Sequence, residues 1–118
     1  MQPSNLLTLA FLFATHASAC LTVTGTIQGT GKSKDVVLYL KDNGVATCSG
    51  GGDSSNTLGC KIGYWAWYYI ADESSAAGPL SVQYQTPHGN FEFTVSPTDC
   101  FTATGQDYQC SYNVQKYC

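Results

Sequence analysis

The stretch Cys60-Lys-Ile-Gly-Tyr-Trp-Ala-Trp-Tyr-Tyr-Ile-Ala-Asp72 decides the fold that this sequence predicts. It holds both tryptophans of the chain and is rich in aromatic and β-branched residues, which favour a pleated strand over a helix. Successive residues of a strand face opposite sides. Even-numbered positions put Ile62, Tyr64, Ala66, Tyr68 and Ile70 on one side, and odd-numbered positions put Lys61, Gly63, Trp65, Trp67 and Tyr69 on the other. Because neither side is polar throughout, we expect a central strand that is covered on both faces, at least in part.

The beginning of the chain is typical of a secretory signal. Residues 6–14 form a short apolar run, and Ala17 and Ala19 provide the small residues that precede a cleavage site at Cys20. The run is far shorter than the roughly 20 apolar residues of a membrane-spanning helix, so we expect no membrane insertion. A cysteine directly after the cleavage site also occurs in bacterial lipoproteins, but there leucine is usual at the position of Ala17. We therefore expect residues 1–19 to be a signal peptide and residues 20–118 to form one secreted, extracellular domain.

Six cysteines follow the predicted signal peptide. They are Cys20, Cys48, Cys60, Cys100, Cys110 and Cys118. An even number of cysteines in a small secreted domain indicates three disulfides, because a domain of this size buries too little apolar surface for ample stability. Six cysteines allow fifteen pairings, among which the sequence does not choose. Cys48 and Cys60 flank one loop and are candidates for a bridge, whereas no CxxC pattern favours a metal site.

Alternating segments separated by turn signals predict an all-β domain. Apolar and polar residues alternate over 20–27, 35–41, 80–85, 91–95 and 108–115, and residues 45–48 add a short strand. Asn43-Gly44 and Pro87-His88-Gly89 are tight-turn sequences. We expect residues 49–59, which are rich in glycine and serine, to be a mobile surface loop. The pattern predicts a small disulfide-stapled β-sandwich or barrel of about seven short antiparallel strands.

The charge of the chain argues against two classes of partner. The net charge is −3, and the cations are five lysines with no arginine and no basic cluster. Nucleic acids and anionic membranes are therefore disfavoured as partners.

No constellation of residues indicates catalysis. His88 is the one histidine after the predicted signal peptide, and it lies in a turn without a nucleophile pattern beside it. The acids that could form a pair for glycoside hydrolysis are Asp72, Glu73, Glu92 and Asp99, which we expect to be solvated surface charges. The oxygen ligands Asp42, Asn43 and Asp53 follow no recognised calcium-loop pattern. We expect no catalytic residue, metal or cofactor, and therefore no enzyme.

The odd-numbered side of the aromatic stretch is the one candidate binding site. Trp65, Trp67 and Tyr69 stand at alternate positions and would form a flat aromatic row if they were exposed. Sugar rings and protein partners both bind to such rows. We expect instead that the three rings belong to the core, because aromatic side chains bury much area in a domain with few leucines and isoleucines.

Several short motifs of the chain are similar to those of a known group of proteins. They are the leader ending Ala17-Ser18-Ala19, Cys20-Leu-Thr-Val-Thr-Gly25, Asp42-Asn43-Gly44, Thr47-Cys48, Tyr84-x-Thr86-Pro87-x-Gly89 and the terminal Cys118. In these the chain resembles the small secreted cysteine-rich, effector-like proteins of filamentous fungi. The resemblance implies a non-enzymatic virulence protein of the apoplast that binds a host or partner protein and so modulates plant immunity. Alternatives are binding of a cell-wall glycan through the aromatic row and an antimicrobial or killer-type toxin, although the acidic charge argues against attack on membranes.

Overall fold

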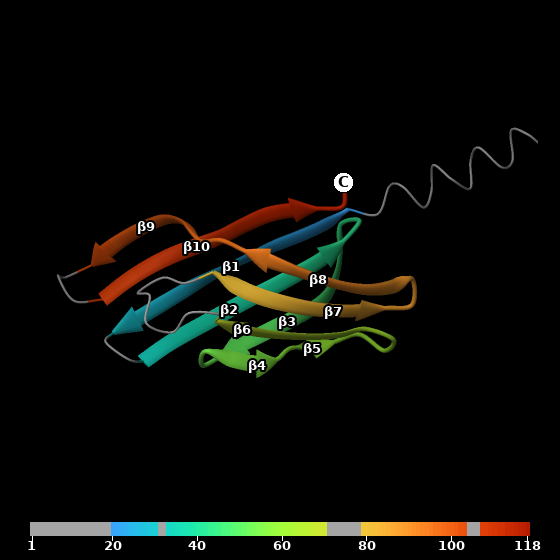
Figure 1. Cartoon of the computed structure of the whole chain (residues 1–118), viewed down its shortest axis with the longest axis horizontal. Coiled ribbons are helices and arrows are strands. Elements are labelled where there is room, and N and C mark those ends of the chain that lie inside the picture. The colour runs from blue at the N-terminus through green and yellow to red at the C-terminus, as the bar shows by residue number, and fades with distance from the viewer. Residues whose placement is uncertain (1–19, 31–32, 71–78, 104–106) are drawn as a thin grey trace, which may run out of the picture.

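Two antiparallel sheets face each other in the computed structural model, which describes residues 20–30, 33–70, 79–103 and 107–118 (Figure 1). The predicted signal peptide lies outside the described residues. Within these ranges the strands are β1 (Leu21–Thr30), β2 (Ser33–Asp42), β3 (Val45–Gly52), β4 (Ser55–Thr57), β5 (Gly59–Cys60), β6 (Trp65–Ile70), β7 (Leu80–Thr86), β8 (Gly89–Val95), β9 (Thr98–Ala103) and β10 (Asp107–Lys116). No helix of the described ranges has the length and apolar character to cross a membrane.

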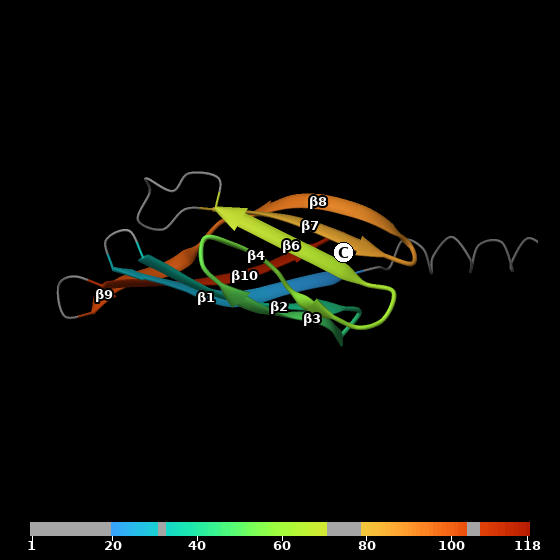
Figure 2. The same ribbon diagram turned by 90° about the horizontal axis from the view of Figure 1, so that it is seen from below.

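The strands are divided between a six-stranded and a four-stranded sheet. The larger sheet has the order β5-β3-β2-β1-β10-β9, and the smaller sheet has the order β4-β6-β7-β8. Figure 2 shows β6, β7 and β8 as one layer over β1, β2 and β10. The sheets do not close into a barrel, so the predicted all-β sandwich is confirmed. The expected count of about seven short strands is too low, and β1, β2 and β10 have ten residues each.

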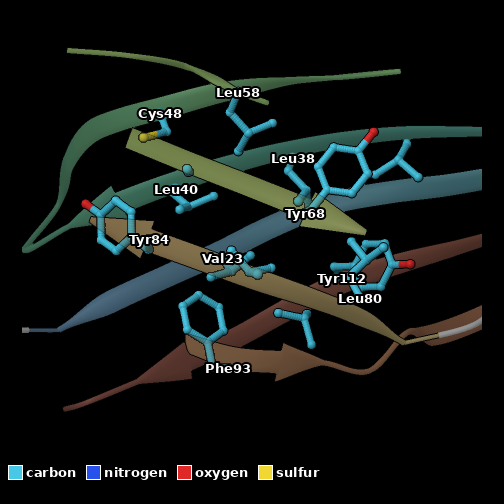
Figure 3. Close-up of a cluster of buried hydrophobic side chains, with 14 of the residues drawn as sticks. Val23, Leu38, Leu40, Cys48, Leu58, Tyr68, Leu80, Tyr84, Phe93 and Tyr112 are labelled. Carbon is cyan, nitrogen blue, oxygen red and sulfur yellow. The ribbon is translucent and has the colours of Figure 1, made fainter. Parts of the chain in front are cut away.

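The core lies between the two sheets and follows the alternation of the sequence. From the larger sheet it contains Leu21, Val23, Ile27, Val36, Leu38, Leu40, Cys110 and Tyr112, and from the smaller sheet Ala66, Tyr68, Ile70, Leu80, Val82, Tyr84, Phe93 and Val95. Figure 3 shows side chains from both sheets pointing into this layer. Burial of these side chains is the main stabilising term of the sandwich.

The glycine-rich stretch 49–59 is not the surface loop that we expected. β3 continues through it to Gly52, β4 follows, and β5 ends at Cys60. Gly51 shows why glycine suits a strand here, since it pairs with Val37 and a Cβ at its position would collide with the Val36 carbonyl. The missing side chain therefore lets β3 approach β2 closely.

Both predicted turns are confirmed. Asn43 and Gly44 join β2 to β3 with φ angles of 52° and 83°, the left-handed conformation that Asn-Gly hairpins adopt. Pro87 and His88 join β7 to β8 between the paired residues Thr86 and Gly89. These turns, the β5–β6 turn and the C-terminus lie at one end of the sandwich (Figure 1).

All six cysteines form disulfides, as expected. The bridges are Cys20–Cys118, Cys48–Cys60 and Cys100–Cys110. The first ties the beginning of β1 to the chain end, and the candidate bridge between Cys48 and Cys60 is confirmed, because these two residues are paired between β3 and β5. Three disulfides in so small a domain are consistent with an extracellular protein.

Candidate functional site

The two sides of β6 differ sharply in their environment. Ala66, Tyr68 and Ile70 are buried between the sheets, whereas Trp65, Trp67 and Tyr69 point away from the core. Trp65 and Tyr69 are each 37% exposed, and Trp67 is half-buried. The expectation that these three rings belong to the core is therefore wrong, and this side of β6 is covered only in part. No described strand covers the outer face of the smaller sheet.

Trp65, Trp67 and Tyr69 form the aromatic row, which runs along the middle of the outer face. The ring centroids of Trp67 and Tyr69 are 5.0 Å apart, with 34° between the ring planes. Residues at alternate positions of a strand are spaced by about 6.6 Å, so the row spans about 13 Å from Trp65 to Tyr69. Trp67 and Tyr69 form a tilted pair of rings, and Trp65 follows at the next outward position.

Polar side chains border the aromatic row on both sides. Directly opposed residues of antiparallel strands share one face of the sheet. The register puts Ser55 and Thr57 of β4 on one side of the row, and Ser81, Gln83, Gln85, Asn90, Glu92 and Thr94 of β7 and β8 on the other. Gln83 and Gln85 pair with Trp67 and Trp65. Amide and hydroxyl groups thus lie beside each ring.

A shallow hollow of mixed polar and apolar lining lies on β7 and β8, next to the aromatic row. It has a volume of about 260 Å³ and is lined by residues 83–85 and 90–92. The Gln83 side-chain Nε2 donates a hydrogen bond of 3.1 Å to Glu92 Oε2 across β7 and β8. This contact uses one of the two Gln83 N–H donors and one of the two Glu92 carboxylate oxygens. The hollow therefore presents mixed donors and acceptors next to an aromatic surface.

The outer face is nearly neutral and has no aliphatic side chain among its described residues. Glu92 is the one charged group that the register places on it. An anionic ligand would find no counter-ion on this face, and a cationic ligand would find only Glu92. An aliphatic patch of a protein partner would find only aromatic rings and polar side chains. The face is suited to a flat, neutral ligand with many hydroxyl groups.

The structure places the other candidate residues apart from this site or from one another. His88 is exposed in its turn, where its backbone N–H donates to Thr86 Oγ1. Asp99 is exposed at the start of β9, and Asp72 and Glu73 lie outside the described residues. No group of three or more His, Cys, Asp and Glu residues within the described ranges could hold a metal ion. The suggested calcium ligands are separated by the length of β3, with Asp42 and Asn43 before it and Asp53 after it.

No family model matches the chain, and neither the curated proteins nor the solved structures contain a match. The assignment of a site therefore depends on the geometry alone.

The polar border of the row was missed by the sequence reasoning. Gln83, Gln85, Asn90 and Glu92 alternate with buried residues, so their outward direction was predictable. Their position beside the tryptophans depends on the pairing of β6 with β7 and of β7 with β8. The predicted turn at residues 87–89 groups the four polar residues on one hairpin, but it does not join them to the row.

Proposed function

We propose that the protein is a secreted, non-enzymatic domain that binds a neutral cell-wall polysaccharide on the outer face of its four-stranded sheet. The observation that supports this most is the exposed aromatic row beside the hollow lined by Gln83, Gln85, Asn90 and Glu92. The predicted signal peptide and the three disulfides support an extracellular site of action.

The chemistry of a linear, flat polysaccharide fits both parts of the site. The apolar face of a pyranose ring can pack on Trp65, Trp67 or Tyr69 and bury aromatic area. Its equatorial hydroxyl groups then point sideways, toward the amides of Gln83 and Gln85 and the carboxylate of Glu92. Because the row follows β6, the sugar chain is expected to lie along this strand. Hydrogen bonds to the carboxylate would be the strongest of the set.

A second candidate function is docking of a protein partner, the activity that the resemblance to fungal effector-like proteins implies. Ile62 favours it, since this side chain is fully exposed in the turn between β5 and β6, and Val45 is 52% exposed at the same end of the sandwich. Exposed aliphatic side chains that cluster at one end can mark a protein interface. An Ile62→Ser variant should lose such a partner while glycan binding is retained.

Retention on insoluble polysaccharides tests the main proposal. Oxidised protein should be depleted from solution by at least one of cellulose, chitin and β-glucan, and Trp65→Ala and Trp67→Ala should each weaken retention at least tenfold. Tyr39→Ala is the matched control, because Tyr39 is 50% exposed on the other sheet. Equal retention of the tryptophan variants and the control would refute the role of the aromatic row. Gln83→Ala should weaken retention less than the tryptophan changes do.

A further inference from the structure

We propose that the sandwich carries a second binding site, for the ammonium head of an alkylamine, between the sheets at the end where Cys20 and Cys118 are bridged. This site shares Tyr84 and Phe91 with the hollow beside the aromatic row, but Asp42 and Tyr117 line only this site, and it does not depend on the polysaccharide proposal. It is built from an acidic side chain and three aromatic rings that four different parts of the chain bring together.

The site is a small cavity between the sheets. Its volume is about 20 Å³, and it is lined by Leu21, Asp42, Tyr84, Phe91 and Tyr117. A cavity of about 10–15 Å³ is enough for one water molecule. The cavity therefore accepts one group of the size of a water molecule or an ammonium head, and a tetramethylated head is too large for it.

Aromatic rings form most of the wall. The centroid of the Phe91 ring lies 6.3 Å from that of Tyr84 and 4.8 Å from that of Tyr117. Cations bind to the faces of such rings within about 6 Å of the centroid. This end of the sandwich already holds one such contact, since Lys116 Nζ lies 6.0 Å from the centroid of Phe93. The wall is therefore suited to a positive charge.

Asp42 supplies the negative charge. This side chain is half-buried at the end of β2, and its Oδ2 lies 3.5 Å from the Tyr84 hydroxyl, which donates to it. No lysine or histidine of the described ranges forms an ion pair with it. A carboxylate beside a small apolar cavity attracts a cation more strongly than one in open water, because the local dielectric constant is lower. An ammonium N–H can donate to the free carboxylate lone pairs while the rings surround the charge.

Tyr117 leaves a path for the rest of the ligand. This side chain is 45% exposed, whereas Tyr84 and Leu21 are buried. The alkyl chain of a bound amine would leave the cavity beside the Tyr117 ring and pack on it. The same head group occurs in free alkylamines and in the lysine side chain of a polypeptide.

Titration of the ¹⁵N-labelled protein with n-butylammonium tests the proposal. We expect shift changes centred on Asp42, Tyr84, Phe91 and Tyr117, and at least tenfold weaker binding of the neutral 1-butanol and of tetramethylammonium. Asp42→Asn keeps the shape of the side chain and should weaken butylammonium binding at least tenfold. Asp35→Asn, at an exposed position of the same strand, should leave it unchanged. Butanol binding as tightly as the amine, or full affinity in Asp42→Asn, would overturn the site.

The source of the amine is distinguished by a second ligand, Nα-acetyl-lysine methylamide. Tighter binding of this compound than of butylammonium assigns the site to a polypeptide lysine, and weaker binding assigns it to a free amine. Its Nε-acetylated form should not bind, and equal binding of that neutral form would contradict the proposal. Polysaccharide retention in Asp42→Asn should be normal, which separates this test from that of the outer face.

Discussion

The hydroxyl oxygens of Tyr84 and Thr47 lie 2.8 Å apart in the interior, and the hydrogen bond between them joins the two sheets. Thr47 reaches this position through a β-bulge. The pairing of β2 with β3 changes from Leu40–Cys48 to Lys41–Ala46, which leaves Thr47 without an opposing residue and turns it inward. The Thr47 hydroxyl donates its single proton to the Tyr84 oxygen, while the Tyr84 hydroxyl donates to Asp42, and the Leu40 carbonyl oxygen, 3.4 Å from Thr47 Oγ1, is the alternative acceptor. The bulge thus satisfies two buried hydroxyl groups at once.

We expect Thr47→Val to lower the free energy of unfolding by about 1–2 kcal/mol, because it leaves the buried Tyr84 hydroxyl with only its long contact to Asp42. Urea unfolding of the oxidised protein measures this. Thr94→Val, at an exposed position of β8, is the control and should change stability by less than about 0.5 kcal/mol. Equal effects of the two changes would mean that the bond between the sheets adds nothing.

Stability should fall as the pH rises from about 10 to 12. Burial, with a smaller effect of the nearby carboxylates of Asp53 and Asp42, raises the pKa of Tyr68 and of Tyr84 to about 12, from an ordinary value near 10. Between pH 10 and 12 the unfolded chain has released tyrosine protons that the folded protein still holds. Each rise in pH within this range therefore lowers the free energy of unfolding. Urea midpoints at several alkaline pH values, with the disulfides verified by mass, measure the slope. Tyr84→Phe should make stability depend less steeply on pH in this range. An unchanged dependence would contradict the assignment of the effect to the raised pKa of Tyr84.

Alternation in the sequence was enough to predict the core side of most strands. The apolar positions Val36, Leu38 and Leu40 of the alternating stretch 35–41 are buried, and so are Ala66 and Tyr68 on the even-numbered side of β6. This works because each strand has one face toward the core, and a period of two is a local property of the chain. The existence of two sheets follows from the same pattern, since one-sided apolar strands need a second layer.

Three features could not be predicted from alternation, because they depend on how distant segments of the chain pack and pair. Both sides of β6 are apolar enough to be buried, so the sequence does not show which side faces the core. The side that carries Trp65 would be buried only if a third layer covered it. The pairing of Cys20 with Cys118 depends on β1 and β10 being neighbours, although 98 positions separate the two cysteines. The glycine-rich part of β3 has weak strand propensity, and its place in the sheet depends on close contact with β2.

That close contact predicts unequal costs for two glycine substitutions. Gly51→Ala should destabilise the protein by several kcal/mol or prevent folding, because the added methyl group would overlap the Val36 carbonyl backbone. Gly59→Ala is the control, since the nearest atom to its added Cβ would be the Ser49 carbonyl oxygen at an ordinary 3.6 Å. Expression and thermal unfolding of the two variants measure the difference. A stable Gly51→Ala protein would show that β3 does not pack against β2 in this register.

The three disulfides should contribute unequally to stability. The Cys20–Cys118 bridge closes a loop of nearly the whole domain, and the loop-entropy relation gives it about 4.7 kcal/mol, against less than about 3 kcal/mol for Cys100–Cys110. Paired Cys→Ser variants, compared by urea unfolding, measure each contribution. Peptide mapping of the oxidised wild-type protein must also find these linkages. A larger loss of stability on removal of Cys100–Cys110 than on removal of Cys20–Cys118 would contradict the assignment of the larger contribution to the bridge that closes the long loop.

Tryptophan fluorescence should report directly on the proposed polysaccharide site, because Trp65 and Trp67 are the only tryptophans and both lie in the aromatic row. Acrylamide should quench the tryptophan fluorescence of the folded protein with a rate constant that is a substantial fraction of the one measured after unfolding in guanidinium. Trp67→Phe leaves the more exposed Trp65 and should be quenched more efficiently than Trp65→Phe, which leaves the half-buried ring. A bound oligosaccharide should protect both tryptophans from quenching by acrylamide. Quenching many times weaker in the folded protein than in the unfolded chain would show that another part of the protein or a second copy covers the row, and the face would then be closed to a sugar chain.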